Sequence, residues 1–496
     1  MDVFKKSKIW FITGTQLLYG GDAVRQVDEH SQTITRGLNA GALPLEIVYK
    51  GAVDSAEEID SLLKRANTEP ECAGIIVWMH TFSPAKMWIR GLKTLNKPLL
   101  HLHTQFNREI PWAQMDMDYM NLNQSAHGDR EFAHILSRMR INRRIVVGFW
   151  DDRETQFQIA DWMRVCAAWC DQQTLRIVRF GDNMNNVAVT DGDKVEAEVR
   201  LGYHVDYYPV GDLVETQKGV ADAEIRDLVE TYEAEYLVAQ ELRSNEAAWR
   251  QVWEAAREEL AIRRFLEEKK AKAFTTNFDA LHGLNQLPGL ASQRLMAEGI
   301  GFGAEGDWKT AALTRLFSVM GFGLEGGSSF LEDYVLHFKG EGAILQAHML
   351  EVSPSITRER PRLEVHPLGI GGKADPARLV FSAHEGTGVA ATIVDLGDRF
   401  RMIAAKVQCL ALEADLPKLP VARAFWKPEP NLAIGAAAWM LAGGTHHSAF
   451  SFDLSFDQLE DYAELAQMEL VIIDENTNLR ALKEILRVNE VFYRSM

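Results

Sequence analysis

The first third of the chain alternates short apolar runs with longer amphipathic stretches. Apolar runs of about six residues predict β-strands, and apolar positions that recur every three to four residues predict helices. The predicted strands are Lys8–Thr13, Pro44–Tyr49, Gly74–Met79, Pro98–His103, Arg144–Phe149 and Leu175–Phe180. The predicted helices between them are Ala23–Leu38, Ala56–Ala66, Arg130–Met139 and Thr155–Trp169. Strands that alternate with helices indicate βαβ units around a parallel sheet, in which ligand groups gather at the carboxyl ends of the strands.

The pattern changes near residue 180. Residues Val187–Val199 predict a hairpin that turns at Asp191–Gly192–Asp193. From about residue 330 onward the pattern is rich in predicted strands. The other predicted elements are helices at Ser244–Lys270, Asp307–Met320, Phe456–Met468 and Leu479–Val488, and strands at Lys272–Asn277, Leu379–Phe381, Val389–Leu396 and Arg399–Val407. The length of 496 residues suggests about three domains.

Composition and charge disfavour several kinds of partner. Lys and Arg total 53 and Asp and Glu total 70, so the net charge is −17. Nucleic acids and acidic membranes require a net basic face, so we expect neither as a partner. The longest apolar run, residues 432–444, is too short to span a bilayer, and we expect it to be buried. The four cysteines form no Cys-x-x-Cys pair, which favours reduced thiols in a cytoplasmic protein.

Four glycine-rich stretches contain acids or histidines, at residues 301–310, 323–334, 348–354 and 442–448. Glu305, Glu332, His348 and His447 would together offer two carboxylates and two imidazoles. That mixture suits Mn²⁺, Fe²⁺, Co²⁺ or Zn²⁺ better than Ca²⁺. The spacing forms no local metal-binding motif, however, so each residue could equally be a surface acid or a hydrogen-bonded structural histidine.

Two further glycine-rich stretches lack the spacing of nucleotide-binding loops. Residues 369–373 (GIGGK) have neither the four-residue gap nor the Ser or Thr of a phosphate loop, so we expect a tight turn there. Residues 14–21 (GTQLLYGG) lack the Gly-x-Gly-x-x-Gly fingerprint, which disfavours NAD or FAD. Gln16 and Tyr19 in that stretch could instead contact a polar ligand.

Taken together, segments along nearly the whole chain resemble the L-arabinose isomerase family, whose enzymes interconvert L-arabinose and L-ribulose. The matching segments are GTQLLYG at 14–20, WMHTFSPAKMW at 78–88, HTQFN at 103–107, DMDYMNLNQSAHGDREF at 116–132, RFGDNM at 179–184, VAVTDGDKV at 187–195, LHGLNQLPGLA at 281–291, EGDWKTAAL at 305–313, SFLEDY at 329–334, HMLEVSPSI at 348–356, GIGGKADPARL at 369–379 and AGGTHHS at 442–448.

The resemblance implies a role for particular residues. The metal ligands would be Glu305, Glu332, His348 and His447, holding one Mn²⁺ per site with Co²⁺ as a substitute. The substrate-binding residues would be Gln16, Leu18, Tyr19, Gln124, His127, Met184, Phe278 and His446. Asp307, Phe330 and Glu351 match further positions around the site. We expect Glu305 and Glu332 to act as acid and base through a cis-enediol, with a direct hydride shift as the competing route.

The resemblance also implies the architecture and the assembly. Residues 1–175 would form an N-terminal α/β domain that covers the site of a neighbouring subunit. Residues 176–325 would form a central α/β domain with Glu305, and residues 326–496 a β-rich domain with Glu332, His348 and His447. The family assembles as homohexamers.

Two alternatives remain open at this stage. One is a related metal-dependent isomerase of another aldose, such as L-fucose or D-galactose; the other is a non-catalytic sugar-binding protein. Since one extra carbon in a pocket is discriminated by only about 1–3 kcal/mol, we expect slow conversion of D-galactose to D-tagatose as a side activity.

Overall fold

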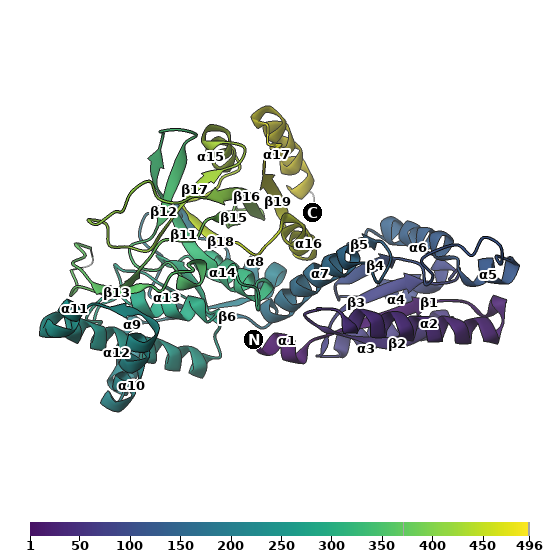
Figure 1. Ribbon diagram of the computed structural model, residues 1–496, viewed down its shortest axis with the longest axis horizontal. Helices are drawn as coiled ribbons and strands as arrows, with labels where there is room; N and C mark the ends of the chain where they lie inside the picture. Colours follow the sequence, from purple (N-terminus) through teal and green to yellow (C-terminus); the bar gives the residue numbers. More distant parts are fainter. Residues whose placement is uncertain (371, 495–496) are drawn as a thin grey trace. The chain divides into compact units, whose positions relative to one another are not determined.

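The structure is a computed structural model that describes residues 1–370 and 372–494. The chain forms two compact units, Met1–Asp171 and Gln172–Met496, which Figure 1 shows in sequence colours. The two units share no sheet, and each buries its own apolar residues.

The first unit is a five-stranded parallel sheet with helices on both faces. Its strands are β1 (Lys8–Gly14), β2 (Glu46–Val53), β3 (Cys72–Met79), β4 (Leu99–His103) and β5 (Arg144–Val147), in the order β2-β1-β3-β4-β5. This is the flavodoxin-like order of a doubly wound sheet. The helices are α1 (Asp2–Lys6), η1 (Leu17–Tyr19), α2 (Gly21–Ala40), α3 (Ala56–Thr68), η2 (Ala85–Trp88), α4 (Ile89–Leu92), α5 (Met117–Leu122), α6 (Ser125–Met139) and α7 (Arg153–Gln172).

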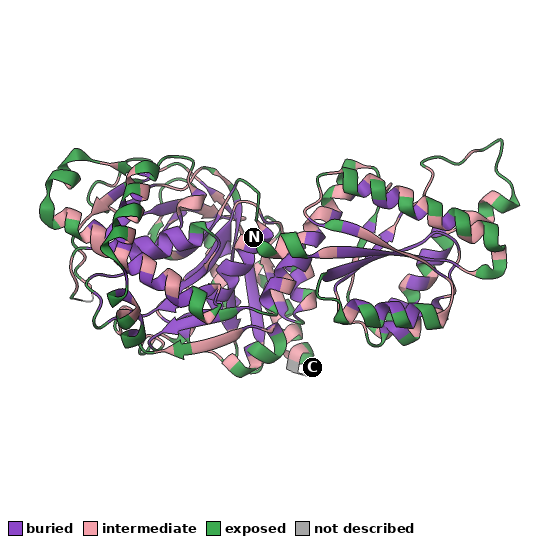
Figure 2. Cartoon of the chain, turned by 90° about the horizontal axis from the view of Figure 1, so that it is seen from below, coloured by how far each residue is buried: buried purple, intermediate pink, exposed green. Residues whose placement is uncertain are grey.

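Alternate residues of each strand supply two separate cores in this unit. Ile9 and Phe11 of β1 face the core that includes residues of α2 and α7. Trp10 and Ile12 face the opposite core, which includes residues of α3 and α6. Figure 2 shows the buried strands between helices that are exposed on their outer sides. Because both faces are covered, the strands are continuous apolar runs, as expected for a parallel sheet.

The second unit combines a parallel sheet with a β-barrel. The parallel sheet has the order β10-β9-β6-β7 and contains β6 (Arg176–Phe180), β7 (His204–Tyr208), β9 (Ala273–Thr276) and β10 (Gly301–Ala304). The barrel sheet contains β11 (Ser328–His337), β12 (Ala343–Ala347), β15 (Gly386–Asp395), β16 (Phe400–Cys409), β17 (Arg423–Pro428), β18 (His447–Ser451) and β19 (Glu469–Ile473). Its order is β15-β18-β11-β12-β17-β16-β19, and an additional pairing of β15 with β16 closes the ring.

The remaining elements of the second unit are a small sheet and the helices. The small sheet contains β8 (Leu237–Val238), β13 (Arg362–Val365) and β14 (Ala377–Val380). The helices are η3 (Ala188–Thr190), α8 (Lys194–Leu201), α9 (Val210–Lys218), α10 (Asp222–Glu235), α11 (Gln240–Ser244), α12 (Glu246–Lys269), α13 (Gly289–Ala297), α14 (Trp308–Met320), η4 (Pro354–Ile356), α15 (Leu432–Leu441), α16 (Phe456–Leu465) and α17 (Leu479–Arg494). The predicted fold class, parallel α/β followed by a β-rich segment, is confirmed. In the part of the chain that is described, no helix has both the length and the apolar character needed to cross a bilayer.

The hairpin predicted at Val187–Val199 is wrong. The segment forms η3 and then helix α8, because the Asp193 carboxylate accepts hydrogen bonds from the backbone N–H groups of Val195 and Glu196, at 2.9 and 3.0 Å. Such an N-cap stabilises a helix by about 1 kcal/mol. The alternation of valine and glutamate in this segment imitates a strand, but Ala197 is the residue that packs inward.

The apolar run at residues 432–444 is only partly buried, contrary to the prediction. Helix α15 lies within it, and Leu432, Gly435 and Ala438 form its buried side. Met440 on the same helix is 70% exposed. The helix is apolar on every side, so the sequence pattern does not reveal which side packs inward.

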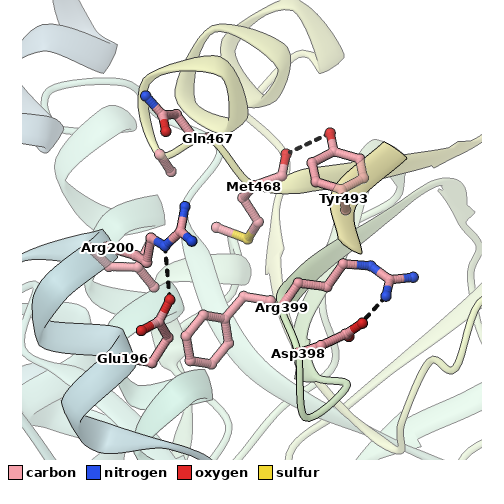
Figure 3. A pocket seen from close by; sticks show the side chains of 10 residues that line it. Glu196, Arg200, Asp398, Arg399, Gln467, Met468 and Tyr493 are labelled. Atoms are coloured by element: carbon pink, nitrogen blue, oxygen red, sulfur yellow. Dashed lines mark hydrogen bonds and ion pairs between the residues drawn. The ribbon is translucent and has the colours of Figure 1, made fainter. Parts of the chain in front are cut away.

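Ion pairs join strand β19 and the closing helix α17 to the barrel, and Arg399 Nη2 lies 3.1 Å from Glu490 of α17. Glu469 of β19 is fully buried and lies 2.7 Å from Arg399 Nε and 2.9 Å from Arg401 Nη2. Figure 3 shows a small pocket nearby, where Arg399 pairs with Asp398 and the Tyr493 hydroxyl donates to the Met468 carbonyl. The pocket holds only about 30 Å³, room for a single water, and its arginines already face carboxylates. It therefore joins structural elements and is not a ligand site.

Candidate metal centre and active site

The turn between β10 and α14 carries Glu305 and Asp307 at the carboxyl end of the parallel sheet. A Cβ at Gly303 would lie 2.2 Å from the Asp307 carbonyl oxygen, so only glycine lets the strand approach the helix this closely. Glu305 has a φ of 61°, a left-handed conformation that costs energy in a non-glycine residue and is concentrated at functional sites. Asp307 then caps α14 by accepting from the Lys309 and Thr310 backbone N–H groups, each at 3.2 Å.

The barrel supplies the other site residues from three neighbouring strands. Glu332 of β11 pairs in register with His447 of β18 on one side and with Ala347 of β12 on the other. His348 follows Ala347 directly, so the antiparallel register brings these side chains to one end of the barrel. The Phe330 ring packs edge-on against both imidazoles, with centroid distances of 5.2 Å to His348 and 5.3 Å to His447.

Both imidazoles are held in the same manner. His447 Nδ1 lies 3.0 Å from the Asp307 carboxylate, and His348 Nδ1 is hydrogen-bonded to the Glu351 carboxylate. When Nδ1–H donates to a carboxylate, Nε2 carries no proton and its lone pair is available to bind a metal. This is the arrangement found in metal-ligating histidines. His447 Nε2 lies 3.7 Å from Glu305 Oε2, and His348 Nε2 lies 3.4 Å from Glu332 Oε2.

Two buried atoms at this point lack a hydrogen-bond partner, namely His447 Nε2 and Glu332 Oε2. An unpaired buried polar atom is costly, and a metal ion at the site would satisfy both. Glu305, His446 and His447 also place one ligand atom each within 4.8 Å of one another. The residues present therefore fit a divalent cation bound by carboxylate and imidazole groups.

The charges around the site shift several pKa values. Burial, only partly offset by His348 and His447, raises the pKa of Glu332. Burial disfavours the charged form of His348, but the Glu351 carboxylate and then Glu332 raise its pKa overall. Asp307 is buried too, yet the Lys309 ammonium and His447 hold the pKa of that carboxyl well below its usual range. Asp307 thus remains a carboxylate that accepts from His447.

The residues expected to bind substrate fall into two groups. In the second unit, the Met184 N–H donates to the Glu305 carbonyl at 2.9 Å, and Phe278 lines a pocket with Glu305 and His348. His446 Nε2 lies 3.7 Å from Glu332 Oε1, which places His446 directly beside a candidate metal ligand.

The other group lies in the first unit. Gln124 Nε2 donates to the Tyr19 hydroxyl at 3.1 Å, and His127 Nδ1 lies 3.1 Å from Gln124 Oε1. Gln16 and Leu18 precede Tyr19 in the chain; Gln16 is half-buried, and Leu18 is 79% exposed. Tyr19, Gln124 and His127 thus form one hydrogen-bonded group, and the exposed Leu18 directly precedes Tyr19 in the chain.

Two further residues at the site, Tyr334 and Lys309, belong to no sequence pattern that marks them as functional. Tyr334 lies against Glu332, and burial together with that carboxylate raises the pKa of the Tyr334 hydroxyl. The pairing of β11 is irregular between Asp333 and Val335, so simple alternation along the strand does not indicate this contact. Lys309 is buried, and its Nζ lies 3.3 Å from Asp307 Oδ1. The only sequence signal for this contact was the position of Lys309 two residues after Asp307.

Comparison with known proteins gives consistent matches along the chain. Residues 3–174 match the L-arabinose isomerase N-terminal domain, residues 176–323 the central domain and residues 327–469 the C-terminal domain. An L-arabinose isomerase of Phocaeicola vulgatus is 59% identical over 99% of this chain and 98% of its own length. Those of Bacteroides thetaiotaomicron and Thermotoga petrophila are 58% and 53% identical over the same shares.

The doubly wound sheet, the barrel and the matches over the whole chain define an enzyme of the isomerase class. More specifically, the chain belongs to the L-arabinose isomerase family.

Proposed function

We propose that this enzyme interconverts L-arabinose and L-ribulose with one divalent ion, Mn²⁺ or alternatively Co²⁺, bound by Glu305, Glu332, His348 and His447. The observation that carries the metal site is the matched orientation of the two imidazoles, each tied at Nδ1 to a carboxylate with Nε2 directed toward a glutamate. The substrate is supported by the names of the relatives, which match over nearly their whole length.

Aldose–ketose isomerisation moves a hydrogen between C2 and C1 of the sugar and needs no external redox cofactor. A bound divalent ion would act as a Lewis acid on two adjacent sugar oxygens. Glu305 and Glu332 would divide the proton transfer. One carboxylate would take the C2 proton while O1 gains a proton, which gives a cis-enediol, and the other would deliver a proton to C1 while O2 loses its proton. Burial raises the pKa of Glu332 in the metal-free chain, and a cation held by this carboxylate would lower it again, so a base role requires that Glu332 is not bound to the ion when it takes the proton.

His446, Met184 and Phe278 would contact the sugar from the same unit. His446 adjoins Glu332, and Phe278 supplies an apolar wall of the pocket that also contains Glu305. We assign the exposed group around Tyr19, Gln124 and His127 to the site of a neighbouring subunit in a homohexamer.

Ketose formation from a panel of aldoses tests this proposal. The purified chain is stripped with a chelator and assayed with L-arabinose, D-galactose and L-fucose, with and without Mn²⁺. We expect ribulose from L-arabinose only with the metal, and slower tagatose formation from D-galactose. Full activity after rigorous removal of metal would exclude a role of the ion in the reaction. A preference for L-fucose would support the alternative of a related isomerase that acts on another aldose.

Two variants separate catalysis from mere sugar binding. Glu305→Ala and Glu332→Ala should abolish turnover and leave the fold intact, whereas Glu325→Ala, an exposed acid on the loop before β11, should behave as the parent chain. Sugar binding without ketose formation in the parent chain would identify a non-catalytic binder. In deuterated water, deuterium in the product supports the enediol route, and its complete absence supports a hydride shift.

A further inference from the structure

Lys373 in the GIGGK segment is used by the protein itself. Its ammonium donates to the carbonyl oxygens of Leu281 and Leu284, at 2.6 and 3.0 Å. The next residue, Ala374, donates its N–H to the Asn285 carbonyl at 3.1 Å. Lys373 and its neighbour therefore tie the segment to the turn at residues 281–285, and the ammonium is not free to bind a phosphate.

Both of the segments joined in this way contribute to the pocket at the candidate site. Ile370 lines it from the segment that contains Lys373, and Phe278 and Leu281 line it from the chain that leads into the turn at residues 281–285. Glu305 and His348 lie in the same pocket. The pocket is small, with a volume of about 20 Å³, so a small displacement of these apolar residues would change its size by a large fraction.

The far side of the turn is anchored independently of Lys373. The Gln286 amide donates to the Gln251 carbonyl at 2.7 Å, and its Oε1 accepts from the Ala377 N–H at 2.8 Å. The Gln286 backbone N–H also donates to the buried Glu258 carboxyl at 3.3 Å. Loss of the Lys373 ammonium should therefore loosen the side of the turn near the pocket and leave the turn attached to α12.

We propose that Lys373 is a positioning residue that sets the width of the apolar wall formed by Phe278, Leu281 and Ile370, and thereby the size of sugar that the site accepts. This inference rests on the proposed function. One extra carbon in an apolar pocket is discriminated by only about 1–3 kcal/mol, so a small shift of this wall is enough to alter the preference between two such sugars.

The kinetic test compares Lys373→Met with Lys373→Arg and the parent chain. Arg can still donate to two carbonyls, whereas Met preserves the length and the apolar stem but donates nothing. In Lys373→Met, we expect the ratio of kcat/KM for L-arabinose to that for D-galactose to fall about tenfold, near the lower end of what one carbon contributes. The fall should come from a higher KM for L-arabinose with little change in kcat. The Lys373→Arg chain should keep most of the parent chain's ratio of kcat/KM values.

Lys418→Met is the matched control, because Lys418 is an exposed lysine of the same unit. It should leave both sugars unaffected. A merely structural role of Lys373 would lower the activity toward both sugars equally, and this result would overturn the specificity role.

Hydrogen exchange tests the tether without any turnover. The Leu284 N–H, which donates to the Leu281 carbonyl at 3.4 Å, should exchange at least tenfold faster in Lys373→Met than in the parent chain. Equal exchange would overturn the tether, and faster exchange with an unchanged sugar preference would overturn its role in selectivity. Should the parent chain form no ketose, the proposed function fails, and the ratio of Kd values for the two sugars, measured by calorimetry, decides the inference instead.

Discussion

Asp307→Asn changes a single atom beside the candidate metal site and tests how His447 is held. In the native chain, Asp307 Oδ1 caps α14, and Oδ2 accepts from the Thr310 hydroxyl at 2.6 Å and from His447 Nδ1 at 3.0 Å. If the asparagine oxygen keeps the cap, its NH₂ group faces His447 Nδ1 and donates to it. The imidazole must then carry its proton on Nε2, the atom that lies 3.7 Å from Glu305, and it can no longer bind a metal there.

Loss of a carboxylate that orients a ligating histidine weakens metal binding about 10- to 100-fold, equivalent to about 1.4–2.8 kcal/mol. The buried Lys309 loses its carboxylate partner as well, which destabilises a protein by about 3–5 kcal/mol when nothing compensates. Lys309 also donates to the Val189 and Asp191 carbonyls, at 2.7 and 2.6 Å, so we expect the lower end of that range.

Calorimetric titration of chelator-treated protein with Mn²⁺ measures the first effect, and thermal unfolding of the metal-free protein measures the second. Asp193→Asn is the matched control, because Asp193 caps α8 in the same unit and contacts the backbone N–H groups of Val195 and Glu196. An unchanged Kd for Mn²⁺ in a folded Asp307→Asn protein would refute the assignment of His447 as an oriented ligand.

Two further predictions concern the first unit. Burial, and then the neighbouring His30, lowers the pKa of His80 to about 3, so this group is neutral in the folded chain and binds a proton near pH 6.5 in the unfolded chain. The contribution of His80 to stability is therefore complete above pH 6.5 and is lost as the pH falls toward 3. Denaturant unfolding should show that the free energy of unfolding falls by about 2 kcal/mol between pH 6.5 and 5 because of this group, and by less in His80→Gln. An equal dependence of the free energy of unfolding on pH in the two chains would contradict the burial argument. If Gln124 serves a neighbouring subunit, inactive Glu305→Ala and inactive Gln124→Ala chains should regain activity when they are dissociated and reassembled together, and a mixture that stays inactive would contradict the shared site.

The strands and the long helices of the first unit could be predicted from the sequence because the central strands β1 and β3 are buried, mostly apolar runs between amphipathic helices. Lys8–Thr13 and Arg144–Phe149 are predicted within two residues of β1 and β5. The hairpin prediction at Val187–Val199 failed because a periodicity of two over a few residues also occurs on an exposed helix face, where Val195 and Val199 lie. Only the Asp193 cap distinguished the two structures.

The types of residue in the candidate site could be identified from the sequence, but their partners could not. Asp307 and His447 are 140 positions apart, and no local pattern links them. Glu332 and His447 become neighbours through the antiparallel register of β11 and β18, two strands that lie far apart in the sequence. The adjacent histidines also differ in burial, which the sequence does not reveal: His447 is fully buried and His446 is 40% exposed, although their ring centroids lie only 4.4 Å apart.

The most direct test of the account is an anomalous diffraction measurement on crystals of the chain grown with Mn²⁺. We expect one strong peak per subunit, bounded by Glu305, Glu332, His348 and His447, with the Nε2 atom of each histidine facing the ion. A peak elsewhere, or four side chains that share no ion at saturating Mn²⁺, would contradict the metal site on which the proposed isomerisation depends.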